Sequence, residues 1–76
     1  MPKLQKVSGH KLLKILCNKF GFEISGRKGS HIRLSKQTAE GKIGTTVPIH
    51  KELKIGTLKG ILKQAQISEE ELSEYL

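Results

Sequence analysis

The chain has 76 residues, enough for one small domain, and its basic residues outnumber its acidic residues by 14 to 7. A single cysteine excludes an internal disulfide framework, and no apolar run approaches the ~20 residues of a membrane span. No N-terminal apolar stretch resembles a secretory signal, so we expect one soluble, cytoplasmic domain. Its core is too small for an enclosed cofactor pocket, which leaves an open face or a shallow groove for any chemistry.

The charge is unevenly distributed along the chain. All 14 lysines and arginines lie between Lys3 and Lys63, where only three glutamates oppose them, and four more glutamates follow Ser68. A basic body of this kind predicts a polyanionic partner, with nucleic acid as the first candidate. The alternative is that the lysines serve only solubility.

The first expected element is an amphipathic helix over residues 9–19. Ser8 is suited to cap its N-terminus, and apolar residues recur at helical spacing from Leu12 to Phe20. Gly21 is suited to stop the helix in the left-handed conformation.

Three strands are expected next. Residues 22–25 and 31–34 alternate apolar and polar side chains, and residues 27–30 are typical of a turn, so these segments predict a hairpin. We expect residues 35–42 to form a polar loop, and residues 43–47 to form a third strand that ends at a proline.

Two helices are expected to close the chain. After a connection over residues 49–54, apolar residues at helical spacing predict a second helix. They are Leu58, Ile61, Leu62 and Ala65, with Ile55 expected to pack at the entry of the helix. Ser68 and Glu71 have the spacing of a capping box, and acidic residues crowd the turn that follows, so a short third helix is expected over residues 68–76.

This order predicts an α+β fold, α-β-β-β-α with a short C-terminal helix, in which three antiparallel strands share one apolar face. The expected face consists of Phe22, Ile24, Ile32, Leu34, Ile43 and Val47. Both main helices should cover it, because it is the face that needs burial. The opposite face should carry Glu23, Ser25, His31, Arg33 and Thr46. His31 and Arg33 are therefore expected to point away from the core.

His31 is the strongest candidate for chemistry. It follows a glycine turn, begins a strand, and has Arg27, Lys28 and Arg33 nearby. Cations stabilise the charge that develops on a reacting phosphodiester, and an imidazole moves protons near neutral pH. In RNA, a base acting on the 2′-hydroxyl makes that oxygen the nucleophile without a metal. The alternative is an exposed strand histidine with no role.

Other side chains are weaker candidates. None of the three histidines is spaced as a metal pair, so no metal site is predicted. Cys17 lies on the apolar side of the first helix and is interpreted as a small buried hydrophobe. His50 either contacts a ligand or caps the next helix. Lys59 and Lys63, one helical turn apart, either hold phosphates or form a solvated face.

Several motifs in this order resemble the HicA toxin family, small ribonucleases of bacterial and archaeal toxin–antitoxin pairs. The resemblance covers about residues 7 to 68. Its motifs are Ser8-Gly9, Leu12-Leu13, Phe20-Gly21-Phe22, Arg27-Lys28-Gly29-Ser30-His31, Val47-Pro48-Ile49-His50, Glu52-Leu53-Lys54-Ile55-Gly56-Thr57-Leu58, Ile61-Leu62-Lys63-Gln64-Ala65 and Ile67-Ser68. The Gly-Ser-His element is weak by itself, but its order and spacing with the later motifs make the combination specific.

The resemblance implies a fold similar to a double-stranded-RNA-binding domain. We expect residues 1–76 to form a single domain, with a core over about residues 7–67 and, from the residues themselves, an acidic C-terminal helix over residues 68–76. It also implies mRNA cleavage with His31 as the catalytic residue, and a HicB-like antitoxin that covers this region. Two features depart from the family pattern. Lys54 stands where such proteins often have proline, and the acidic tail is not part of the pattern.

The leading hypothesis is thus a metal-independent endoribonuclease, the toxin of a toxin–antitoxin pair, with His31 as general base or acid and no cofactor. The residues expected to bind RNA are Arg27, Lys28, Gly29, Ser30, Arg33, Lys59 and Lys63. A second proton carrier is needed, and Lys28, Ser30, His50 and water are all open. The runner-up is a non-catalytic RNA-binding module that uses the same face, and a third possibility is a DNA-binding or protein-interaction subunit.

Overall fold

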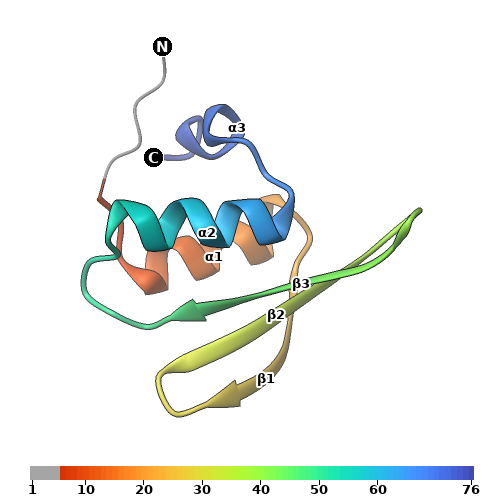
Figure 1. Cartoon of the computed structure of the whole chain (residues 1–76), viewed down its shortest axis with the longest axis horizontal. Coiled ribbons are helices and arrows are strands. Elements are labelled where there is room, and N and C mark those ends of the chain that lie inside the picture. The colour runs from red at the N-terminus through yellow and green to blue at the C-terminus, as the bar shows by residue number, and fades with distance from the viewer. Residues whose placement is uncertain (1–5) are drawn as a thin grey trace.

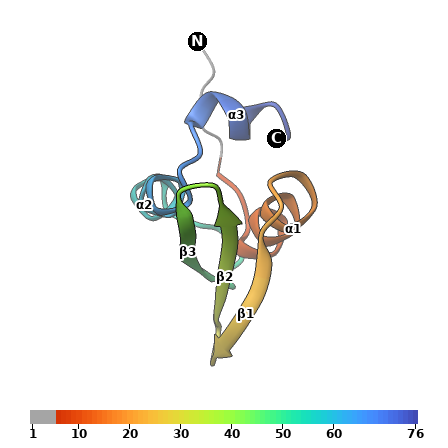
Figure 2. The same cartoon turned by 90° about the vertical axis from the view of Figure 1, so that its right-hand side faces the viewer.

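The computed structural model describes residues 6–76. Six elements follow in the order α1 (Gly9–Lys19), β1 (Glu23–Lys28), β2 (His31–Thr38), β3 (Gly41–Pro48), α2 (Ile55–Ala65) and α3 (Glu69–Ser73). The strands form one antiparallel sheet in the order β1-β2-β3. Helices α1 and α2 lie side by side over one face of the sheet, and α3 packs beyond them (Figures 1 and 2). The predicted α-β-β-β-α fold with a short C-terminal helix is confirmed.

The first helix begins and ends where the sequence predicts. The Ser8 hydroxyl accepts a hydrogen bond from the Lys11 amide at 3.1 Å, which satisfies one of the free donors at the helix start. Gly21 adopts a φ of 76°, and the chain then reverses so that the Phe22 amide donates to the Leu16 carbonyl at 3.1 Å. This reversal leads directly into β1.

The expected loop over residues 35–42 is wrong. Strand β2 continues to Thr38, β3 begins at Gly41, and only two residues turn between them. The Thr38 hydroxyl donates to the Gly41 carbonyl and accepts from the Glu40 amide at 3.2 Å, which fixes the turn. This part of the hairpin projects beyond the helices (Figure 1), so neither of its faces requires the apolar alternation that usually identifies a strand.

The first hairpin also differs from the prediction. Strand β1 extends to Lys28, which leaves Gly29 and Ser30 as a two-residue turn instead of the four-residue turn expected. The φ of 58° at Gly29 suits the first position of such a tight turn. The pairing of β1 with β2 shifts between Ile24 and Gly26, so Ser25 is an extra residue in a β-bulge.

The core lies between the two helices and the sheet. Of the six residues expected on the apolar face, Phe22, Ile32, Leu34 and Val47 are buried, and Ile43 is partly buried. The expectation for Ile24 is wrong, since it is 59% exposed. Both helices pack mainly against β3, whereas Ile24 lies on β1, the opposite edge strand of the sheet. Leu72 of α3 completes the core and is fully buried.

Candidate functional site

His31 and Arg33 lie on the sheet face opposite the helices. Both are exposed, and they alternate along β2 with the buried residues Ile32 and Leu34. The prediction that these two polar side chains point away from the core is confirmed. Arg33 pairs across the sheet with Thr46 of β3, which is also exposed. The face is therefore open to a large ligand.

The β-bulge decides which cation faces His31. Strict alternation from Phe22 and Ile24 would place Lys28 on the side of the helices. The extra residue in the bulge inverts this order, so Lys28 pairs directly with His31 and shares its face. Arg27 pairs instead with Ile32, and its Nε donates to the Gly29 carbonyl at 3.2 Å, which braces the turn.

A shallow hollow on this face brings together four of the eight residues predicted to form the site. It is lined by Ser25, Gly26, Arg27, Lys28, His31, Arg33 and Thr46. Gly29 and Ser30 form the turn beside it and are exposed. Lys59 and Lys63 are exposed on α2 and do not line this hollow. An adjoining hollow is lined by Arg33, Gly44, Thr45, Thr46 and Gln64, so the surface continues from the sheet towards α2.

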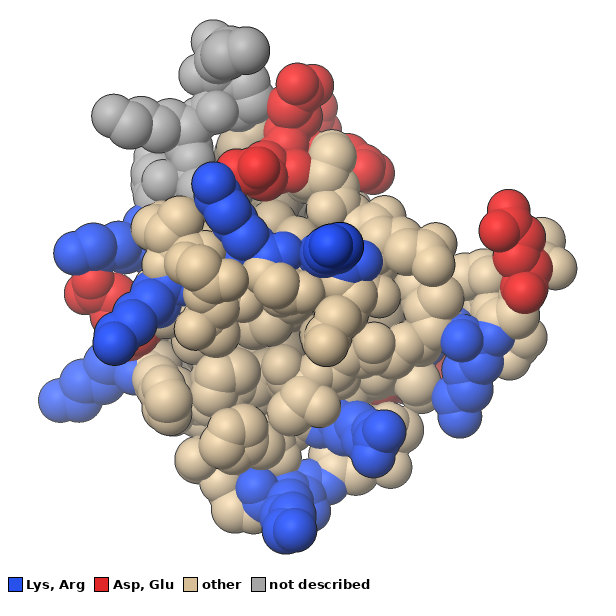
Figure 3. Space-filling view, viewed as in Figure 1, with Lys and Arg blue, Asp and Glu red and all other residues tan. Residues whose placement is uncertain are grey.

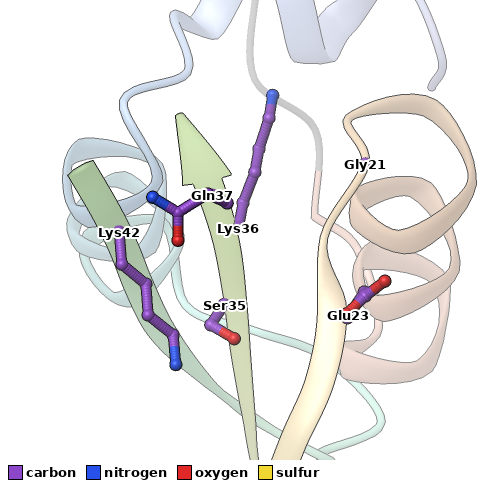
Figure 4. Close-up of a pocket in the computed structure, with 6 residues that line it drawn as sticks. All are labelled: Gly21, Glu23, Ser35, Lys36, Gln37 and Lys42. Atoms are coloured by element: carbon purple, nitrogen blue, oxygen red, sulfur yellow. The ribbon is translucent and has the colours of Figure 1, made fainter. Parts of the chain in front are cut away.

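A second hollow lies at the other end of β1 and β2 and is different in character (Figure 4). Its lining residues are Gly21, Glu23, Ser35, Lys36, Gln37 and Lys42. Lys36 and Lys42 extend in opposite directions, and the Lys36 ammonium lies 5.8 Å from the centre of the Phe22 ring. No imidazole lines this hollow, so the candidate site is the hollow at His31.

The structure brings His50 next to His31. The centres of the two imidazole rings are 6.5 Å apart, and the ring planes meet at 75°. Sequence reasoning left His50 open between ligand contact and helix capping. The capping alternative is wrong, because α2 begins with Lys54 at its N-cap position. The Lys54 side chain makes no capping bond.

Backbone contacts hold the two histidines in register. His31 pairs with Pro48 at the end of β3, and the Ile49 amide donates to the Ser30 carbonyl at 2.7 Å. The Gly9 amide donates to the His50 carbonyl at 2.9 Å. A Cβ atom on Gly9 would collide with the Pro48 carbonyl and lie 2.9 Å from the Ile49 Cα, so this close approach requires glycine.

The site end of the sheet is cationic and lacks acidic partners. Within residues 6–76, the one ion pair joins Lys6 to Glu52, so no carboxylate lies within pairing distance of Lys28 or Arg33. Figure 3 shows acidic side chains over α3 and also at the left and right edges of the view, while basic side chains are spread over the rest of the visible face. A cationic sheet face with an exposed imidazole suits a polyanion.

Three further expectations concern Cys17, metals and membranes. Cys17 is half-buried against the core, and burial raises the pKa of its thiol, which disfavours the nucleophilic thiolate. Among the described residues, no three side chains of His, Cys, Asp or Glu are grouped to hold a metal ion. Across residues 6–76 no helix has both the length and the apolar character needed to cross a membrane.

The element order and sheet define a two-layer domain with the topology of a double-stranded-RNA-binding domain, carrying a histidine on a basic sheet face. A family model described as the HicA toxin of bacterial toxin–antitoxin matches residues 9–67. This match runs from the start of α1 past the end of α2 and includes every element of the site, so the chain belongs to the HicA toxin family. Searches of curated proteins and of solved structures find no match.

Proposed function

We propose that this chain is a metal-independent endoribonuclease that cleaves mRNA in the cytoplasm and is inhibited by a HicB-like antitoxin. One observation carries the proposal. His31 is exposed on an open sheet face, directly across from Lys28 and two residues from Arg33, and neither cation is neutralised by a carboxylate within the described chain. Membership of the HicA toxin family supports it.

In the proposed reaction, the phosphorus of a phosphodiester exchanges its bond to the 5′-oxygen of one nucleotide for a bond to the 2′-oxygen of the nucleotide before it. His31 acts as general base or general acid in this step, because an imidazole both takes up and releases a proton near neutral pH. Lys28 and Arg33 hold the phosphate and stabilise the negative charge that grows on its oxygens in the transition state. The step consumes no water and needs no electron carrier.

The remaining predicted contacts position the RNA. Gly29 and Ser30 form a turn with little side-chain bulk, which lets an RNA backbone approach His31 closely. Arg27 braces that turn through its bond to the Gly29 carbonyl and leaves its remaining guanidinium donors for phosphate. Lys59 and Lys63 lie on α2, outside the hollow, so we assign them to phosphates further along the strand.

The antitoxin is proposed to cover the same face. Silencing a cationic surface requires a partner that brings acidic groups to it and excludes RNA. A complex that leaves His31 open to RNA would contradict this part of the proposal. An amine-modifying reagent measures this cover directly. Adding the antitoxin should protect Lys28 from the reagent, and Lys59 serves as the internal comparison.

The first test is RNA cleavage in the presence of EDTA by the wild type and by His31→Ala. We expect the variant to lose at least about 100-fold in rate, the usual contribution of a general acid or base, while retaining RNA in a filter-binding assay. His10→Ala is the matched control, because His10 is an exposed histidine outside the hollow. Retention of RNA without cleavage by the folded wild type would identify a binding module instead.

A further inference from the structure

The pair formed by His31 and His50 bears directly on the mechanism. A phosphoryl transfer of the proposed kind moves two protons, one from the attacking 2′-hydroxyl and one to the departing 5′-oxygen. A single imidazole on an open face leaves one of them unassigned. We propose that His50 is the second catalytic residue of this site and that His31 and His50 act as an acid–base pair, an assignment that rests on the proposed ribonuclease function.

The spacing of the rings fits two groups that flank one phosphate. A working hydrogen bond between a catalytic side chain and a reacting oxygen spans about 2.6–3.2 Å. Two imidazoles that serve one phosphate approach its attacking and leaving oxygens from different sides, along directions inclined to the line between the rings. Ring centres 6.5 Å apart bring both imidazoles within reach of a single phosphate. Within residues 6–76 neither imidazole makes a side-chain hydrogen bond, so both remain available to a substrate.

Backbone hydrogen bonds hold the segment that carries His50 in a fixed position. The segment over residues 48–50 is joined to the turn before His31 by the bond between the Ile49 amide and the Ser30 carbonyl. It is joined to the start of α1 by the bond between the Gly9 amide and the His50 carbonyl, where no side chain fits. Leu53, which follows, is buried and donates its amide to the Val7 carbonyl at 2.8 Å. These attachments limit how far the two rings can separate.

Two proton transfers accompany the exchange of bonds at phosphorus. A neutral imidazole of the pair takes the proton of the 2′-hydroxyl while that oxygen forms a bond to phosphorus. The bond from phosphorus to the 5′-oxygen breaks, and the other imidazole, protonated, gives its proton to the departing oxygen. The products are a 2′,3′-cyclic phosphate and a free 5′-hydroxyl. The pair ends with its protonation exchanged and returns to its starting state through solvent.

Sulfur in place of the departing 5′-oxygen separates the two roles, because a thiolate leaves without a proton. We would first map one cleavage site with the wild type. We would then compare His31→Gln and His50→Gln on a short RNA spanning that site and on the same RNA with a 5′-bridging sulfur. Each variant should lose at least about 100-fold on the ordinary RNA, as expected for loss of an acid or a base. Sulfur should restore the rate for one variant and leave the other slow.

The outcomes distinguish this inference from the proposed function. Folded wild-type protein that cleaves no RNA at the mapping step overturns both. Wild-type cleavage that His50→Gln leaves within a few-fold overturns the pair alone, as does failure of the sulfur substrate to rescue either variant. His10→Gln is the control for loss of an exposed histidine and should cleave as the wild type does. Rescue by sulfur requires a folded protein, so it excludes misfolding in the rescued variant, and urea unfolding checks that the variant that stays slow is folded.

Discussion

The end of the sheet that carries His31 and the C-terminal helix α3 are held by different kinds of contact. At the site end, the start of α1, the β1–β2 turn and the segment after β3 meet through bonds between residues far apart in the chain, such as Gly9 with His50 and Ser30 with Ile49. In α3, the Ser68 hydroxyl accepts from the Glu71 amide and the Glu71 carboxylate accepts from the Ser68 amide, both at 3.0 Å.

The two regions also differ in charge and in position. The site end carries lysine, arginine and histidine on an open face, whereas α3 has three glutamates in its first turn, where the helix dipole favours them. Figure 1 places α3 on the side of the helices away from the β1–β2 turn. The hydrogen bonds that cap α3 are local, and Leu72 anchors this helix in the core away from the hollow at His31. Weakening the cap should therefore cost stability without moving the site, whereas the site end links stability to function.

The substitution Gly9→Ala should distort the site end. Among the substitutions that compare the two regions, it should have the largest effect on stability and cleavage. A methyl group at Gly9 meets the Pro48 carbonyl, so the segment that carries His50 must move. We expect a loss of about 1–3 kcal/mol in unfolding free energy, as for other overpacked sites, although alanine is the better helix former. Cleavage should fall at least ten-fold, because a small displacement of catalytic groups is costly.

Urea unfolding and the cleavage assay measure these two effects. The matched control is Gly60→Ala on α2, where a Cβ meets nothing within 4 Å and φ is not in the left-handed region. There we expect a gain of up to about 1 kcal/mol and unchanged cleavage. Equal stability of the two alanine variants would show that the close approach of α1 to Pro48 does not constrain the site.

The substitution Ser68→Ala should weaken α3 without reaching the site. It removes the hydroxyl that accepts from the Glu71 amide, and loss of such a cap usually costs about 1 kcal/mol. Cleavage should be unchanged, since α3 makes no contribution to the hollow at His31. Ser73→Ala is the control, because its hydroxyl bonds the Glu70 carbonyl near the end of the same helix. A cleavage loss in Ser68→Ala would refute the independence of α3.

The smallest predicted effect is the pH dependence of α3. The hydrogen bond from the Ser68 amide holds the pKa of Glu71 below its ordinary value of 4.5. A carboxylate whose pKa is lowered by folding stabilises the fold above its unfolded value, and that stability disappears as pH falls through its folded value. Urea unfolding measured at a series of pH values, from neutral to below the folded pKa of Glu71, gives the free energy of unfolding. This free energy should fall less on acidification in Glu71→Gln than in the wild type, and Glu74→Gln should behave as the wild type does.

Much of the fold was predictable because its signals are local. Ser8 and Gly21 mark the two ends of α1, and the capping box marks α3. The alternation around Ile32 places His31 and Arg33 on the outer face. The strands beyond residue 35 escape prediction because they project past the helices, so burial does not impose apolar residues there. Alternation wrongly assigns Ile24 to the core because it does not reveal how far a helix extends across a sheet.

The sequence by itself determined the order of elements, the helix ends and the side of the sheet on which His31 lies, because each depends on residues within a few positions of one another. Only the tertiary structure decided that Lys28 faces His31 and that His50 is its neighbour. The first depends on a single extra residue in β1 that inverts the alternation. The second depends on the close approach of Gly9 to Pro48, two residues that no local pattern connects.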